Sequence, residues 1–133
     1  MPIEYQIDHG QRLVLAKAVG TLTADDMFTY QREVWSLPEI RGYNELIDMS
    51  DVEKIAEESA VNIKILADLA ASMDTPIITS KFAIVANEDH IYGLGRMYES
   101  FRQLNKRSTK EVRVFRSMKE AMDWVLKQHR ASL

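Results

Sequence analysis

Asp48, Ser50 and His90 supply the residue types of a hydrolase triad, in which a histidine activates a serine and a carboxylate orients the histidine. Such a serine needs a sharp turn, usually flanked by glycines, that exposes its hydroxyl group. Here Met49 and Asp51 flank Ser50 instead. The sequence therefore favours side chains that cap loops and helix ends over a hydrolase site, and we expect no catalytic residue.

These residues belong to a larger set of polar side chains that follow two predicted strands, at residues 45–49 and 81–87. Open parallel sheets bind ligands outside the carboxyl ends of their strands, so we expect any ligand site at this edge. The candidate residues are Asp48, Ser50, Asn87, His90, Tyr92 and Arg96.

The printed sequence lacks the usual motifs for cofactors and metals. It has no cysteine, which excludes thiolate metal sites, iron–sulfur clusters and disulfides. Its histidines, His9, His90 and His129, have no His or carboxylate at the i+4 spacing of a helical zinc site. Residues 93–95 (GLG) begin like a dinucleotide fingerprint, but Tyr98 occupies the third glycine position. We therefore expect no cofactor and no metal, and we attribute the two glycines to close helix packing or a bend.

Charge and hydropathy restrict the possible partners. Seventeen basic and twenty acidic residues give a net charge of −3, which does not provide the basic surface that nucleic acid requires. Glu111 interrupts the most basic stretch, residues 102–116, which we interpret as a solvated face. No apolar stretch reaches membrane-spanning length, and the first residues do not resemble a signal peptide. We expect a cytoplasmic protein that neither binds nucleic acid nor inserts into a membrane.

The spacing of apolar residues predicts the elements. Alternation over residues 3–7 and 12–19 predicts a β-hairpin, in which Gly10 supplies a positive φ at the turn and Gly20 ends the second strand. Three- and four-residue spacing predicts helices at 24–37, 57–73, 87–104 and, after Ser117, 118–126. Short apolar runs predict further strands at 45–49, 81–87 and 112–115.

The resulting order, ββαβαβαβα, predicts an α/β fold. A helix that joins two neighbouring strands forces them to be parallel, with a right-handed crossover. We therefore expect a mixed five-stranded sheet in which only the first strand is antiparallel, with helices packed on it. No repeat, low-complexity tract or linker interrupts the chain, so residues 1–133 are expected to form a single domain.

The helix expected over residues 57–73 has more apolar surface than one contact with a sheet requires. Its main stripe contains Ala60, Ile63, Leu66, Ala67, Ala70 and Met73. Val61, Ile65 and Leu69 form a second stripe that begins on the far side of the helix and leans back towards the first. This second stripe indicates a contact with a protein partner or a second copy of the chain.

Three stretches resemble the bacterial SpoIIAA-like family, also called STAS/SEC14 domain proteins. They are VGTLTADD at 19–26, ELIDMSDV at 45–52, and FAIV at 82–85 followed by YGLGRMYE at 92–99. The resemblance covers nearly the whole chain and implies the SpoIIAA/STAS-like version of the ββαβαβαβα fold. Residues 93–99 are its most distinctive part.

The resemblance also implies a regulatory surface. In the related anti-sigma-factor antagonists, a partner kinase phosphorylates a serine at the start of a helix, and that helix docks on the partner. Residues 48–52 match the preceding strand end, but Ala56, Glu57, Glu58 and Ser59 replace the Asp-Ser-Ser-Gly stretch. Ser59 is therefore either a structural helix cap or a phosphorylation site, and the two glutamates would repel a phosphate or already supply its charge.

Two functions are compatible with these features. The leading hypothesis is a non-enzymatic regulatory or protein-interaction module that associates with itself or with a protein partner through Glu57, Glu58, Ser59, Val61, Ile65 and Leu69. The alternative follows from the SEC14 part of the resemblance: a carrier for a small apolar or anionic ligand, held between the sheet and the helix at 87–104. The second hypothesis requires a cavity.

Overall fold

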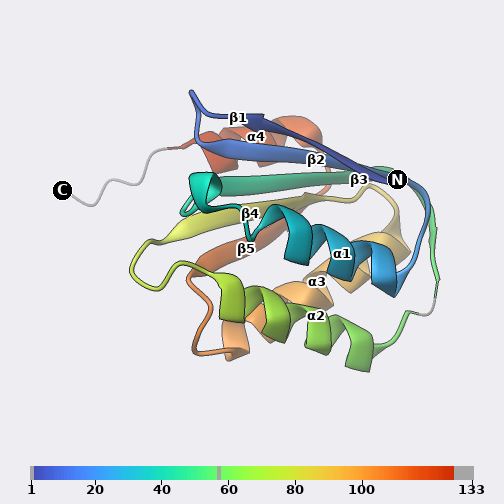
Figure 1. Cartoon of the computed structure of the whole chain (residues 1–133). Coiled ribbons are helices and arrows are strands. Elements are labelled where there is room, and N and C mark those ends of the chain that lie inside the picture. The colour runs from blue at the N-terminus through green and yellow to red at the C-terminus, as the bar shows by residue number, and fades with distance from the viewer. Residues whose placement is uncertain (1, 57, 128–133) are drawn as a thin grey trace.

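The chain forms a five-stranded sheet with helices on both faces (Figure 1). The computed structural model describes residues 2–56 and 58–127. Its elements, in order, are β1 (Ile3–Asp8), β2 (Leu13–Leu22), α1 (Ala24–Val34), the 3-10 helix η1 (Pro38–Ile40), β3 (Asn44–Ile55), α2 (Ala60–Met73), β4 (Ser80–Val85), α3 (Asp89–Leu104), β5 (Lys110–Phe115) and α4 (Met118–Leu126). The expected order ββαβαβαβα is confirmed, with one additional 3-10 turn.

The strands lie in sequence order across the sheet, from β1 at one edge to β5 at the other. β1 pairs antiparallel with β2, from Ile3 opposite Ala18 to Asp8 opposite Leu13. The remaining three pairs are parallel. The predicted mixed sheet, with only its first strand antiparallel, is therefore confirmed.

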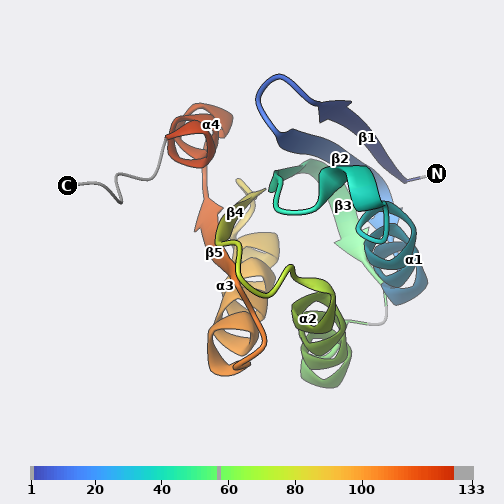
Figure 2. The same cartoon turned by 60° about the vertical axis from the view of Figure 1, so that its left-hand side comes forward.

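Three helices cover one face of this sheet and the fourth covers the other (Figure 2). The connections from β2 to β5 all advance in one direction, so crossovers of one hand place α1, α2 and α3 on the same face. α4 follows the last strand and packs against β3, β4 and β5 from the opposite side. Alternate strand residues therefore enter two cores: Phe82 and Ile84 the larger one, Ala83 and Val85 the smaller.

The hairpin differs from the prediction in its backbone. The positive φ of the turn lies at Arg12 (53°) and not at Gly10, because the turn spans residues 9–12 and its left-handed residue comes last. Gly20 does not end β2 either. Its φ of 71° coincides with a register shift against β3, and the strand continues beyond this irregularity to Leu22.

β3 extends well past its predicted end at residue 49. It pairs with β4 only from Glu45, opposite Phe82, to Asp48, opposite Val85. From there it continues to Ile55 paired with β2. Ser50 consequently lies inside a strand, beyond the end of β4, instead of in a loop.

Side-chain caps define where the helices begin. The hydroxyl of Thr23 accepts a hydrogen bond from the Asp26 amide (3.0 Å), and the Asp26 carboxylate accepts one from the Thr23 amide (2.9 Å). α2 begins at Ala60, later than predicted, because the Ser59 hydroxyl accepts from the Asn62 amide (3.0 Å) and caps the helix. These caps fix the entry of each helix onto the sheet.

α3 lies close to the sheet at one of its two glycines. A Cβ added at Gly95 would lie 3.2 Å from a methyl group of Val114, whereas one added at Gly93 would meet nothing within 4 Å. Close packing therefore accounts for Gly95 alone. Near the end of α3, the apolar Leu104 is 80% exposed, whereas the charged Arg102 is buried, with 2% exposed.

Candidate functional site

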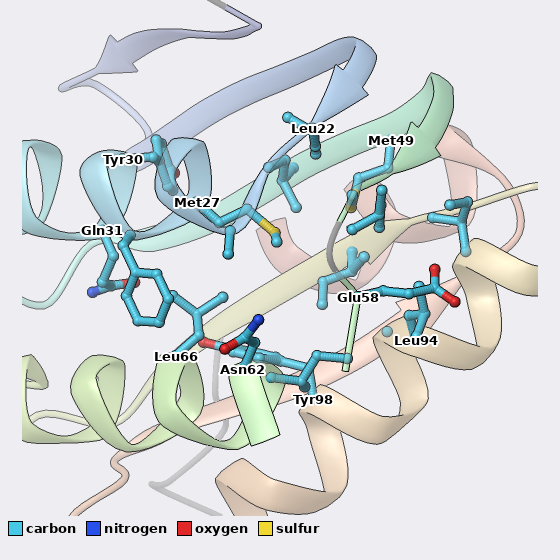
Figure 3. A pocket seen from close by; sticks show the side chains of 18 of the residues that line it. Leu22, Met27, Tyr30, Gln31, Met49, Glu58, Asn62, Leu66, Leu94 and Tyr98 are labelled. Carbon is cyan, nitrogen blue, oxygen red and sulfur yellow. The ribbon is translucent and has the colours of Figure 1, made fainter. Parts of the chain in front are cut away.

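A cavity with a volume of about 100 Å³ lies between the sheet and helices α1, α2 and α3 (Figure 3). Each surrounding element contributes apolar side chains: Met27 from α1, Met49 from β3, Leu66 from α2 and Leu94 from α3. On the strands, the residues that line it are the alternate ones that face this side of the sheet. The cavity is therefore a space beside the larger core that its side chains do not fill.

A network centred on Glu45 lies beside this cavity. One carboxylate oxygen of Glu45 accepts hydrogen bonds from the Tyr30 hydroxyl (2.7 Å) and the Trp35 indole N–H (3.0 Å). The other oxygen accepts from the Lys110 ammonium group (2.9 Å). Burial lowers the pKa of Lys110 and, together with the Glu45 charge, raises the pKa of Tyr30. The polar atoms of Tyr30, Glu45 and Lys110 are thus engaged with one another.

A second network holds Tyr98, another lining residue. The Arg102 guanidinium donates to the Tyr98 hydroxyl (2.6 Å) and to one carboxylate oxygen of Asp74 (2.6 Å). Burial raises the pKa of Tyr98 to about 12. The solvated face predicted for residues 102–116 is wrong for Arg102 and Lys110, because each is buried against a carboxylate from another element.

Neither network was identified from the sequence. Glu45 and Lys110 lie 65 positions apart and Asp74 and Arg102 lie 28 apart, so no local spacing connects them. One signal was available, because Tyr98 and Arg102 are four residues apart on a helix face that is otherwise apolar.

Glu58 and His90 form a bridge next to the cavity. Glu58 lines the cavity just before α2, and His90 lies in the first turn of α3. The imidazole Nε2 lies 2.7 Å from one Glu58 oxygen and 2.9 Å from the other. This hydrogen bond and the carboxylate charge raise the pKa of His90. The pair ties the starts of two of the helices that enclose the cavity.

One solved structure has a similar architecture: an uncharacterised protein of the DUF3478 family with a SpoIIAA-like fold, from Shewanella loihica PV-4. The two superpose with a TM-score of 0.61 over 92% of this chain and 93% of the other, at 21% sequence identity. The chain has a SpoIIAA-like fold. No protein-family model and no curated protein matches the sequence. At 21% sequence identity, this similarity supports the assignment of the fold and no statement about function.

Within this SpoIIAA-like fold, the six residues predicted as a ligand site make mostly local contacts. Asp48 accepts a hydrogen bond from the Ser50 amide (3.0 Å), and His90 bonds Glu58. The Arg116 guanidinium donates a hydrogen bond to the carbonyl oxygen of Asn87 and lies over the ring of Tyr92. Arg96, on α3, lies beside Glu99. None of the six lines the cavity described above, and a site at this edge stays a prediction.

The residues predicted for partner binding have different environments. Val61 and Ile65 are 67% and 50% exposed, so the second stripe of α2 does face away from the sheet, whereas Leu69 is half-buried. Ser59 caps α2 and, like Glu58, lines the cavity. Glu57 lies outside the described residues.

In residues 2–56 and 58–127, no group of three or more His, Cys, Asp or Glu side chains is arranged to hold a metal ion. No helix in this part of the chain has both the length and the apolar character needed to span a bilayer.

Proposed function

We propose that this domain is a non-catalytic binding module that holds a small apolar ligand, or the apolar end of a larger one, in the cavity under α1, α2 and α3. The observation that carries the proposal is the cavity itself, with its methionine, leucine and isoleucine lining. An apolar cavity binds apolar molecules because water inside it would lack hydrogen-bond partners.

The volume limits what the cavity holds. An engineered apolar cavity of about 150 Å³ binds benzene. At about 100 Å³, this one matches a short alkyl group or part of a ring. Larger ligands require α1 and α2 to separate, and these two helices contact each other less than α2 and α3 do. The α1–α2 side is therefore the expected entrance.

The hydrogen bonding around the cavity supports binding over catalysis. The hydroxyls of Tyr30 and Tyr98 are engaged by Glu45 and Arg102, and the pKa of each tyrosine is raised, which keeps both protonated. The structure gives Ser50 and His90 no common hydrogen bond: the Ser50 amide donates to Asp48, and His90 is bonded to Glu58. A nucleophile activated by an adjacent base is thus not part of the proposal.

Native mass spectrometry of freshly purified protein tests for a retained ligand, and titration with hexanol tests the cavity directly. We expect hexanol to shift the methyl NMR signals of Met27 and Met49 saturably. Ile63→Trp fills the cavity from α2 and should abolish these shifts. Ile65→Trp places the same side chain on the exposed side of that helix and should leave them unchanged. Absence of saturable shifts, or equal shifts in both variants, would refute the proposal.

A second candidate function, binding of a protein partner or self-association, is favoured by the exposure of Val61 and Ile65. Two large aliphatic side chains one turn apart on a helix form an apolar surface that a partner would cover. Ile65→Asp should then weaken association without loss of stability, and Ser72→Asp, also exposed on α2, is the control. Light scattering after size-exclusion chromatography measures the change. A monomeric wild-type protein would exclude self-association.

A further inference from the structure

A second cavity, of about 320 Å³, lies at the opposite end of the parallel strands from the predicted ligand edge. It is enclosed by the last turns of α1 and α2, the loop around Arg41, and the first residues of β4 and β5. Its volume falls in the range of small-molecule sites, and its lining is far more polar than that of the first cavity.

Three side chains that line this cavity are more than nine-tenths buried and yet have an oxygen without a partner among the described residues. The amide of Gln31, 8% exposed, donates only to the Met73 sulfur (3.7 Å), and its carbonyl oxygen accepts nothing. The Ser80 hydroxyl, in a residue 6% exposed, makes no hydrogen bond with a described residue. Asp74, with its side chain 5% exposed, receives all its hydrogen bonds on one oxygen, which leaves the other free.

These free oxygens face the cavity. In the part of the chain that the structure describes, no fully enclosed side-chain nitrogen or oxygen lacks a hydrogen-bond partner. The unpartnered oxygens of Gln31, Asp74 and Ser80 are therefore open to solvent. For the deeply buried Asp74 and Ser80 the accessible space is this cavity, whereas Gln31 lies between the two cavities and lines both. Together they accept hydrogen bonds from whatever occupies it.

The same cavity is also lined by two cationic side chains and has an excess positive charge. Lys110 has three N–H groups and donates one of them to Glu45, while its ammonium lies 3.1 Å from the centre of the Trp35 ring. The pairs Lys110–Glu45 and Arg102–Asp74 cancel in charge. Arg41, exposed at the cavity, forms no ion pair with a described residue, so it leaves one net positive charge.

We propose that this polar cavity binds a small organic anion that combines one carboxylate with hydroxyl groups as hydrogen-bond donors. The carboxylate lies between Arg41 and Lys110, and the donor groups meet the free oxygens of Gln31, Asp74 and Ser80. A single uncompensated cation suits a monoanion, because a second negative charge would lie unpaired beside Asp74. This site adjoins the apolar cavity of the proposed function, with Gln31 lining both, and its other lining residues are different.

Titration of isotope-labelled full-length protein with L-lactate and D-glycerate tests this site by NMR, with lactamide as the uncharged match for lactate. We expect saturable shifts of the Trp35 indole and Gln31 amide signals with at least one of the two carboxylates. Lactamide should bind about tenfold more weakly, the usual effect of losing a charged hydrogen-bonding group. Absence of saturable shifts with both carboxylates, or equal affinity for lactamide, would overturn the proposal and indicate a cavity that holds water.

Two variants locate the binding. Arg41→Gln should weaken binding about tenfold, and Ser80→Ala should weaken it less, because it removes one neutral hydroxyl. Arg107→Gln removes an exposed arginine that does not line the cavity and is the control. Hexanol binding should persist in all three variants, which checks the fold and separates this test from that of the apolar cavity. Equal affinity in Arg41→Gln and Arg107→Gln would refute the assignment.

Discussion

Glu45 shows how much of this fold depends on single buried charges. It is 2% exposed and accepts hydrogen bonds from three side chains, one on α1, one on β5 and one in the segment after α1. Removal of a charge from water is unfavourable by several kcal/mol, on the order of the stability of a whole domain, unless the charge is paired and hydrogen-bonded. Tyr30, Trp35 and Lys110 provide this compensation, and in doing so they fix α1 and β5 relative to β3.

Lys110→Met tests this dependence. The substitution keeps the length of the side chain but leaves the Glu45 carboxylate buried without its cation, so we expect the free energy of unfolding to fall by about 3–5 kcal/mol. Lys119→Met is the matched control, because its partner Asp123 is exposed and such pairs contribute about 0–1 kcal/mol. Urea denaturation followed by circular dichroism measures both values. Similar losses in the two variants would contradict this account.

The bridge between His90 and Glu58 predicts a pH dependence. Glu58 raises the pKa of His90 above its ordinary value of 6.5, so the pair stabilises the fold fully below that pH. The stabilisation is lost as the pH rises through the raised pKa, when the imidazole loses its charge. NMR titration should therefore give a His90 pKa above 6.5, and Glu58→Gln should return it towards 6.5. Glu111→Gln, on β5, should leave the His90 titration unchanged.

At the scale of elements, α3 contains a matched pair of glycines. Gly93→Ala should stabilise the protein by about 0.5–1 kcal/mol, because alanine loses less backbone entropy in a helix and its Cβ meets nothing. Gly95→Ala should gain less or lose stability, because its Cβ would lie 3.2 Å and 3.3 Å from the two Val114 methyl groups. Thermal unfolding of both variants measures the difference. Equal gains would mean that α3 does not need Gly95 to approach β5.

The elements were predictable where local patterns decide them. The helix starts at Thr23 and Ser117 and the parallel pairing of β2 to β5 follow from capping and connectivity, and the structure has them. The second half of β3 was not predictable, because residues 50–55 are mostly polar and become a strand only through pairing with β2. A neighbour distant in sequence determines that extension.

The two cavities could not be predicted from sequence patterns. Both arise where three or more elements approach without filling the space between them, and side chains such as Met27 and Leu66 are equally compatible with a filled core. Sequence reasoning placed a ligand site at the carboxyl ends of the strands, whereas the polar cavity lies at the amino ends of β4 and β5. The predicted carrier function required a cavity, and only the packing of the whole molecule reveals one.

At the scale of the whole molecule, the sheet separates the apolar cavity from the core under α4. Val125 is fully buried on the α4 side together with Leu13, Leu46 and Val85. Val125→Ala removes two methyl groups from this core, so we expect it to lower the free energy of unfolding by about 2 kcal/mol. Hexanol binding on the other face should keep its wild-type affinity, because no residue of that core lines the apolar cavity.

Met27→Ala, on the cavity side, is the complementary variant. It removes a lining side chain and enlarges the space beside α1, so stability should fall while the cavity accepts longer alcohols such as octanol more tightly. Urea denaturation and NMR titration of the two variants side by side separate the two faces. A change of hexanol affinity in Val125→Ala, at temperatures where that variant remains folded, would show that the sheet transmits packing changes and that the faces are not independent.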